Sequence, residues 1–208
     1  MELSNSRIEE ALQVYGCGPI PGLPDRIRTY IDLLLKWNRK ISLTTVTDPA
    51  EIINFHFGES LFALSQLKFD KSRLADVGTG AGFPGLPLAM AIPALEVTLI
   101  ESNIKKCAFL AEVIRQLRLS NATIFQGRMQ SLPPSGLPFN YVCARALGQF
   151  EELLGWAGAH LDHGGQLVLW LGESDSKALV GRSDWRWSTP QLIPGSARRH
   201  LLIGSPRV

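Results

Sequence analysis

The chain has 208 residues, of which 45% are hydrophobic and 19% charged, and its formal net charge is +2. This length and composition suit one globular domain with a small extension, and so small a charge does not by itself indicate a nucleic-acid-binding protein. The first residues lack a basic segment followed by an apolar run, and prolines interrupt the longest apolar stretch, near residues 86–100, so we expect neither secretion nor a membrane-spanning segment.

The first seventy residues are predicted to form a helical extension. Apolar residues recur there at helical spacing in three runs. Ser6 and Glu9 have the spacing of a capping box at the start of the first run, and Asp48-Pro49, a capping carboxylate followed by a helix-starting proline, precedes the third. We therefore expect an extension over residues 1–70, with helices near 6–15, 24–38 and 49–64.

From Arg73 onward, strand-like runs alternate with helical ones, which indicates parallel strands joined by helices. The tail differs, because it predicts two strands joined by a turn at Pro194-Gly195. The expected architecture over 71–208 is α/β and Rossmann-like: a seven-stranded, mainly parallel sheet with a C-terminal antiparallel hairpin. We expect strands near 73–77, 95–100, 121–125, 139–143, 165–171, 186–193 and 198–204, and helices near 84–91, 103–118, 148–159 and 173–180.

The run from Asp76 to Gly85, Asp-Val-Gly-Thr-Gly-Ala-Gly-Phe-Pro-Gly, joins the first of these strands to a helix. Gly78, Gly80 and Gly82 permit left-handed or crowded backbone, so a ligand can lie against bare main chain in front of the N–H groups of the helix. Such a turn binds a nucleoside-type cofactor. The run also contains the G-x-G-x-x-G spacing of dinucleotide-binding proteins, so the glycines alone leave the cofactor open.

Two carboxylates narrow the choice of cofactor. Asp76 stands where dinucleotide turns usually carry an apolar residue, and it can meet the ammonium group of S-adenosylmethionine, which NAD lacks. Glu101 ends the second strand, where it can accept hydrogen bonds from both ribose hydroxyls of either cofactor. The alternative is that Asp76 caps the helix and Glu101 is a solvated strand end. We favour S-adenosylmethionine.

No metal site is expected, because His160 and His163 lack an evident third ligand and precede two glycines, which indicates a helix end and a turn. Cys17, Cys107 and Cys143 are far apart and form no Cys-x-x-Cys pair. They favour a reduced cytoplasm.

Several further segments have an order and spacing that are specific in combination. They are Lys36-Trp37-Asn38 to Leu43-Thr44, Asp48-Pro49, His56 with Ser60, the glycine run, Ser102 with Lys105-Lys106, Phe109-Leu110, Arg128, Arg145 and Arg199-His200-Leu201. Over nearly its whole length the chain thereby resembles the bacterial methyltransferases of the RsmG or GidB type, which methylate N7 of a guanine in 16S ribosomal RNA.

The resemblance implies a cytoplasmic enzyme whose partner is 16S ribosomal RNA or the small ribosomal subunit, and we expect it to be a monomer. It also implies cofactor contacts at Gly78, Phe83, Met129, Gln130 and Arg145. The chain departs from the family's usual residues at several positions: Glu59 and Glu101 replace Asp, Gln130 replaces Glu, Ala144 replaces Ser, and Leu171 stands where Lys is frequent. Glu101 is longer than Asp and should still reach a ribose.

The chemistry of guanine N7 explains the lack of a catalytic His or Cys arrangement. N7 has an exposed lone pair and no proton to lose at neutral pH, so methyl transfer needs positioning rather than a general base. Arg145 is the predicted orienting residue and donor to guanine O6, and the alternative is an ion pair with Asp76 or Glu101. On the substrate side we expect His56, whose alternative is a helix-boundary histidine, and the basic residues Arg39, Lys40, Lys105, Lys106 and Arg199.

Three rival functions remain at this point. A small-molecule methyltransferase would share the pocket without needing a basic surface. A dinucleotide-dependent oxidoreductase is disfavoured by Asp76 and by the lack of an evident hydride-transfer partner. A non-catalytic RNA-binding module would keep the cofactor fold for its shape alone.

Overall fold

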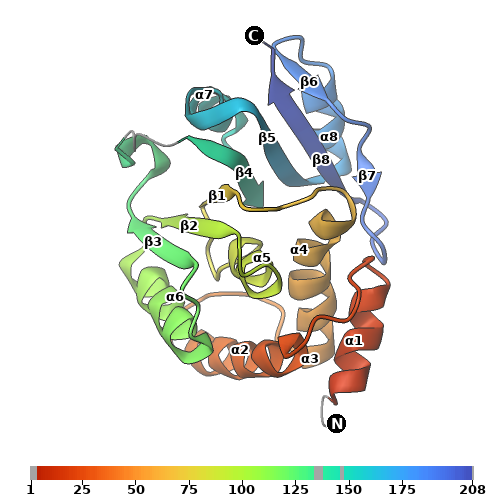
Figure 1. Ribbon diagram of the computed structural model, residues 1–208, viewed down its shortest axis with the longest axis vertical. Helices are drawn as coiled ribbons and strands as arrows, with labels where there is room; N and C mark the ends of the chain where they lie inside the picture. The colour runs from red at the N-terminus through yellow and green to blue at the C-terminus, as the bar shows by residue number, and fades with distance from the viewer. Residues whose placement is uncertain (1–3, 134–137, 146–147, 208) are drawn as a thin grey trace.

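The computed structural model describes residues 4–133, 138–145 and 148–207, and within them an eight-stranded sheet forms the centre of the molecule (Figure 1). The strand order is β3-β2-β1-β4-β5-β8-β6, with β7 also paired to β8. β1 to β5 are parallel, whereas β8 is antiparallel to β5, β6 and β7. The strands are β1 (Arg73–Val77), β2 (Glu96–Glu101), β3 (Ala122–Gln126), β4 (Phe139–Arg145), β5 (Leu161–Gly172), β6 (Trp185–Trp187), β7 (Gln191–Leu192) and β8 (Arg199–Pro206).

Helices cover both faces of this sheet. Side chains of α1 to α6 pack into one buried cluster, and those of α7 and α8 into a second cluster on the other face. The bounds are α1 (Asn5–Gln13), α2 (Leu23–Asn38), α3 (Pro49–Ile52), the π-helix η1 (Ile53–Gly58), α4 (Glu59–Leu61), the 3₁₀ helix η2 (Phe62–Ser65), α5 (Gly85–Ala91), α6 (Ile104–Leu117), the 3₁₀ helix η3 (Met129–Ser131), α7 (Phe150–His160) and α8 (Glu173–Val180).

The alternation of side chains along the strands decides which face each functional residue meets. Leu99 packs into the first cluster and Ile100 into the second, and the same holds for Cys143 and Ala144 on β4. Because successive strand residues point to opposite faces, Arg145 continues the face of Cys143. Its side chain is therefore directed to the side of the sheet that the extension covers.

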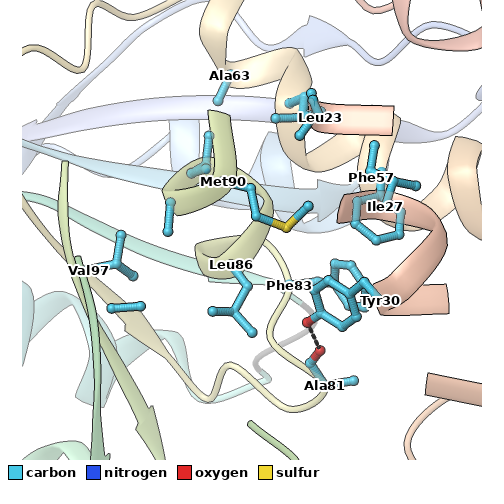
Figure 2. Close-up of a cluster of buried hydrophobic side chains, with 14 of the residues drawn as sticks. Leu23, Ile27, Tyr30, Phe57, Ala63, Ala81, Phe83, Leu86, Met90 and Val97 are labelled. Carbon is cyan, nitrogen blue, oxygen red and sulfur yellow. Dashed lines mark hydrogen bonds between the residues drawn. The ribbon is translucent and has the colours of Figure 1, made fainter. Parts of the chain in front are cut away.

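The helical extension shares its core with the α/β part. Leu23, Ile27 and Phe57 of the extension pack in one cluster with Leu86 and Met90 of α5 (Figure 2). This burial, with its favourable free energy of roughly 25 cal/mol per Å² of apolar surface, fixes the extension against the sheet. The division at residue 70 thus remains a prediction about chain organisation, and the two parts are joined by a continuous core.

The structure corrects the predicted start of the first helix. α1 begins at Asn5, and the Ser4 hydroxyl oxygen caps it by accepting a hydrogen bond from the Arg7 N–H at 3.4 Å. Ser4 provides the capping hydroxyl that was expected of Ser6, two residues earlier in the chain. The predicted capping box of Ser6 and Glu9 therefore lies inside the helix.

Two strand predictions also change. β5 begins at Leu161, which pairs with Phe139 of β4, and the pairing then jumps to Gln166 opposite Tyr141. Residues 162–165, with Gly164 at a φ of 84°, form a bulge inside the strand where a turn was expected. The single strand expected at 186–193 is split into β6 and β7 by residues 188–190, where Pro190 has no N–H to donate. Counting β7, the sheet therefore has eight strands among the described residues rather than the seven expected.

The third predicted helix continues through residues 49–65, but its middle six residues form the π-helix η1. None of the helices in the described ranges is both long enough and apolar enough to span a membrane.

Candidate active site

The glycine turn lies between the C-terminal end of β1 and the start of α5. Gly78, Gly80 and Gly82 all have positive φ, at 67°, 59° and 89°, as the sequence predicted from their residue type. The Tyr30 hydroxyl donates a hydrogen bond to the Ala81 carbonyl oxygen at 2.6 Å (Figure 2). A Cβ atom at Gly82 would lie 2.2 Å from the Tyr30 hydroxyl oxygen. Residue 82 therefore has no room for a side chain.

Asp76 supports this turn from inside the protein. Its Oδ2 accepts hydrogen bonds from the Thr79 hydroxyl at 2.6 Å and from the Gly85 N–H, at the start of α5, at 2.8 Å. Burial raises the pKa of Asp76 to about 6, against the lowering effect of these hydrogen bonds. The side chain is fully buried. This geometry matches the capping alternative, and the contact with the ammonium group of S-adenosylmethionine stays a prediction.

A hollow of about 290 Å³ opens beside the turn, and we call it the β2–β3 hollow. Glu101 lies in its wall with both oxygens fixed: Oε2 accepts from the Gly80 N–H at 3.0 Å and Oε1 from the Asn103 N–H at 2.8 Å. Each carboxylate oxygen keeps a second lone pair for a ribose hydroxyl. The lining residues are Val77, Gly78, Ile100, Glu101, Ser102, Gly127, Arg128, Met129, Gln130, Gln149 and Glu152.

Met129 and Gln130, which the family resemblance assigned to the cofactor, enter this hollow from η3. The Gln130 amide nitrogen donates to Glu152 of α7 at 2.6 Å, so a second carboxylate lines the same hollow. Glu152 was not among the site residues expected from the sequence. The sequence gives little indication of a site role for Glu152, because it is one of two adjacent acidic residues in the first turn of a helix.

A second hollow, of about 240 Å³, lies on the other side of Gly78, and we call it the Arg145 hollow. It brings together the predicted residues His56, Phe83 and Arg145, from the extension, the glycine turn and β4. Gly78 lines both hollows, so the two are neighbours. The lining residues are Leu43, Thr44, His56, Gly78, Thr79, Gly80, Ala81, Phe83 and Arg145.

His56 forms one wall of the Arg145 hollow. Its Nε2 is 2.8 Å from the Thr44 hydroxyl oxygen, and its ring stacks on Phe83 with ring centres 4.7 Å apart. Burial and then the nearby Arg145 charge lower the pKa of His56 from 6.5 to about 4, so the imidazole is neutral at pH 7. Nδ1 is buried and has no hydrogen-bond partner among the described residues.

Arg145 is held by the extension. Its Nη2 donates to the Phe55 carbonyl oxygen at 2.6 Å and to Glu59 Oε2 at 3.0 Å. Within the described residues its ion pair is therefore with Glu59 rather than with Asp76 or Glu101. Nη1 is buried, and nothing in the described part of the chain hydrogen-bonds to it. Glu59, a departure from the family's usual Asp, was not among the site residues expected from the sequence.

The predicted basic residues fall in two places. Lys40, Lys105 and Lys106 line a hollow of about 300 Å³ between the end of α2 and the start of α6, and Arg39 is exposed next to Lys40 in the chain. Arg199 lies apart from them on β8, where its Nε donates to Glu59 Oε1 at 2.6 Å. Leu171 is buried in the second core cluster, where a hydrophobic side chain fits.

The donor set fits S-adenosylmethionine, because the turn exposes bare main chain and Glu101 is oriented toward a space that a nucleoside can enter. Within the described ranges, no three His, Cys, Asp or Glu side chains gather to hold a metal ion. Parallel strands ordered 3-2-1-4-5, a glycine turn after the first and a carboxylate ending the second define a Rossmann-like, S-adenosylmethionine-dependent methyltransferase.

Solved structures show the same fold at low sequence identity. A putative O-methyltransferase from Klebsiella pneumoniae superposes with a TM-score of 0.62 at 13% identity, over 86% of this chain and 90% of that one. A ribosomal protein L11 methylase from Lactobacillus delbrueckii subsp. bulgaricus gives 0.61 at 12% identity, over 74% and 80%.

Sequence comparison specifies the family. The family described as GidB, rRNA small subunit methyltransferase G, matches residues 24–193. "Ribosomal RNA small subunit methyltransferase G" of Coxiella burnetii is 34% identical over 197 residues, covering 94% of this chain and 95% of that protein. The protein of the same name from Pseudomonas putida is 34% identical over 183 residues, covering 86% and 84%. The chain belongs to the rRNA small subunit methyltransferase G family, which confirms the predicted family, fold class and cofactor.

Proposed function

We propose that this enzyme transfers the methyl group of S-adenosylmethionine to N7 of a guanine in 16S ribosomal RNA. The adenosine end would occupy the β2–β3 hollow and the guanine the Arg145 hollow. The observation that carries this assignment is the position of Gly78, which lines both hollows. A group bound across the glycine turn is thereby in reach of both sites.

On the cofactor side, the chain supplies acceptors and bare main chain. Glu101, already fixed by the N–H groups of Gly80 and Asn103, is set to bind ribose hydroxyls, and Met129 gives the hollow an apolar contact. When bound, S-adenosylmethionine supplies an activated methyl group. The protein's part is to hold that group in line with the attacking nitrogen, and such orientation can contribute roughly 7–11 kcal/mol.

On the substrate side, the chain supplies a donor and a stacking wall, and no base is needed. Arg145, which lines the hollow, would donate to guanine O6 and so hold the base with its N7 toward the methyl group. The neutral His56 ring, stacked on Phe83, adds no second positive charge beside a purine that becomes cationic. These features support transfer to a ring nitrogen that carries no proton.

The substrate is proposed to be structured small-subunit RNA, and the enzyme a monomer. Free guanosine offers no phosphates to Lys40, Lys105 and Lys106, whereas an RNA that presents an unstacked guanine offers several. The deciding experiment is methyl transfer to guanosine, transfer RNA, 16S ribosomal RNA and small subunits at matched salt.

We expect activity on 16S ribosomal RNA or on the small subunit, located at a guanine N7 by mapping the methylated base. Equal activity on all four substrates would favour the small-molecule methyltransferase. Transfer to a position other than guanine N7 would contradict the proposal directly. Light scattering of the purified enzyme tests the monomer.

The lysine hollow gives a separate test. Changing Lys105 and Lys106 together to Gln should make the plot of log affinity for RNA against log salt less steep, by roughly 0.7–0.9 for each phosphate that the variant no longer binds. Lys68 and Lys71, exposed before β1 and hence at the opposite ends of the parallel strands, provide the matched control pair. Affinity for S-adenosylmethionine should not change in either variant. An unchanged salt slope in the Lys105/Lys106 variant would remove these lysines from the RNA surface.

A further inference from the structure

Glu59 is a charged side chain with 1% of its surface exposed, and the proposed reaction does not use it directly. It lies at the start of α4, between two arginines from separate strands: Oε2 is 3.0 Å from Arg145 Nη2, and Oε1 is 2.6 Å from Arg199 Nε. A buried carboxylate is costly unless it is paired in this way. Burial raises the pKa of Glu59, and Arg145 and then Arg199 lower it.

The π-helix η1 brings Glu59 and a backbone carbonyl to the same atom of Arg145. The Glu59 N–H bonds to the carbonyls of Asn54, five residues back, and His56, three residues back. In an α-helix it would bond to the Phe55 carbonyl, four residues back. The Phe55 carbonyl oxygen instead accepts from Arg145 Nη2 at 2.6 Å. The extra residue in this turn therefore serves the guanidinium group of Arg145.

Two further contacts fix Glu59 itself. The Trp170 indole N–H of β5 donates to the Glu59 carbonyl oxygen at 2.6 Å. The Arg199 guanidinium lies over the Phe55 ring, 5.0 Å from its centre, while it binds the Glu59 carboxylate. Neither the backbone nor the carboxylate of Glu59 can move far without breaking a contact to β5 or β8.

The guanidinium group is planar, so fixing Nη2 on two acceptors also fixes the direction of Nη1. Arg145 thus has Nη2 bound to the extension, while Nη1 is buried without a partner among the described residues and the side chain lines the Arg145 hollow. Glu59 also offsets the repulsion between Arg145 and Arg199. It leaves the three-residue cluster with one net positive charge rather than two.

We infer that Glu59 is a positioning residue for methyl transfer: it holds the Arg145 guanidinium group in the orientation in which it meets guanine O6. This inference rests on the proposed function, because it assigns Glu59 a role in the substrate half of the same site. Cofactor binding, which depends on the other side of Gly78, should be almost independent of Glu59.

The main test variant is Glu59→Gln, which keeps the shape and removes the charge. We expect kcat on 16S ribosomal RNA or small subunits to fall about 10–100-fold, as for other residues that orient a functional group. The affinity for S-adenosylhomocysteine, measured by calorimetry, should stay within about twofold. Glu59→Asp keeps the negative charge on a side chain that is one methylene shorter. Its activity should lie between those of the wild type and of Glu59→Gln. The matched control is Glu173→Gln, which removes an exposed ion pair with Lys177 on α8 and should leave kcat unchanged.

A double-mutant cycle separates positioning from a general loss of structure. If Glu59 acts through Arg145, Glu59→Gln should cost little further activity in an Arg145→Lys background. Full additivity of the two changes, or a loss of cofactor affinity parallel to the loss of kcat, would overturn the inference. Unchanged kcat in a folded Glu59→Gln variant would overturn it as well.

A spectroscopic readout keeps the inference testable even if the substrate proposal fails. With ¹⁵N-labelled arginine, the Arg145 side-chain N–H signals, assigned by their loss in Arg145→Lys, should be resolved in the wild type because rotation of the group is restricted. They should broaden or merge in Glu59→Gln, and if that variant does not fold, the same loss is expected in Glu59→Asp. Signals that do not change would overturn the inference, whereas failure to methylate any guanine would overturn the proposed function alone.

Discussion

The two hollows that meet at Gly78 are built from different parts of the chain. Every described residue that lines the β2–β3 hollow lies between residues 77 and 152, in the α/β part. The Arg145 hollow also takes Leu43, Thr44 and His56 from the helical extension. The cofactor side is thus a property of the sheet and its own loops, and the substrate side exists only where the extension packs onto the sheet.

The two hollows also differ in the charges of the residues that line them. The β2–β3 hollow is lined by two carboxylates, Glu101 and Glu152, and one cation, Arg128, and the carboxylates accept hydrogen bonds from hydroxyl or amino groups. The Arg145 hollow holds a guanidinium and a neutral imidazole beside it, which suits a carbonyl oxygen such as guanine O6. Changes on the two sides should therefore affect different steps: cofactor affinity on one and transfer on the other.

The largest expected effect is that of Arg145→Ala. Losing the residue that positions the guanine costs on the order of 10²-fold in kcat, or about 2.7 kcal/mol. Arg145→Lys should restore little, because a single ammonium cannot bind Phe55 and Glu59 and still donate to a substrate. Methyl-transfer kinetics with a melting curve for each variant provide the measurement. Full activity of a folded alanine variant would reduce Arg145 to a structural role.

The next prediction concerns two buried groups, Asp76 and His56, whose titrations change the free energy of unfolding in opposite directions. Burial raises the pKa of Asp76 from 3.8 to about 6, so the folded state binds more protons than the unfolded state between those pH values, and stability falls as pH rises through them. Burial lowers the pKa of His56 from 6.5 to about 4, so stability rises with pH over nearly the same range. Each shift corresponds to roughly 3 kcal/mol, and the two contributions nearly cancel.

Urea unfolding at pH 4 to 7 tests this cancellation. In Asp76→Asn the free energy of unfolding should rise with pH because the His56 contribution remains. In His56→Gln it should fall from about pH 4 to pH 6 because the Asp76 contribution remains. Parallel pH profiles for the two variants would contradict the opposed titrations.

The cofactor side was largely predictable from sequence, because its parts are local. Alternating strands and helices predicted β1 to β5 closely, and a glycine turn after the first strand needs positive φ, which Gly78, Gly80 and Gly82 have. Glu101 ends a strand that the sequence predicts, so its location at the C-terminal end of that strand was predictable too. Asp76 shows the limit: its residue type suggested a ligand contact, but full burial and two internal hydrogen bonds depend on packing that no local pattern reveals.

The substrate side was predictable only in its individual residues. His56 and Arg145 were identified through the family resemblance, yet 89 positions separate them in the chain, and their shared hollow depends on how the extension docks. The π-helix that releases the Phe55 carbonyl for Arg145 has no periodicity that distinguishes it from an α-helix of the same residues. The Glu59 ion pairs follow from that geometry, so the sequence could not indicate them.

On the cofactor side, Glu101→Gln should weaken binding of S-adenosylmethionine by about 1.5–3 kcal/mol, the value of a hydrogen bond to a charged group. One side-chain oxygen remains, so the N–H groups of Gly80 and Asn103 compete with the ribose for it. Calorimetry gives the affinity, and the KM for RNA should not change. A loss of kcat at saturating cofactor would break the proposed division between the two hollows.

The smallest expected effect concerns Tyr30, a residue of the helical extension whose hydroxyl contacts the glycine turn. Tyr30 is fully buried, stacks on Phe83 at 5.3 Å and donates its hydroxyl proton to the Ala81 carbonyl oxygen (Figure 2). Tyr30→Phe keeps the ring and removes the donor. Ala81 lines the Arg145 hollow, where water can replace the missing hydrogen bond, so the cost should be about 1 kcal/mol.

Because the Ala81 carbonyl belongs to the glycine turn, part of this cost should be seen as weaker binding of S-adenosylmethionine and not only as a lower melting temperature. Tyr141→Phe is the matched control: its hydroxyl donates to the Lys68 carbonyl oxygen at 3.1 Å on an exposed part of the surface, away from both hollows. We expect cofactor affinity to fall in Tyr30→Phe and to stay constant in Tyr141→Phe. Equal cofactor affinity in both variants would show that the extension supports the substrate side alone, and would make the contrast between the two hollows complete.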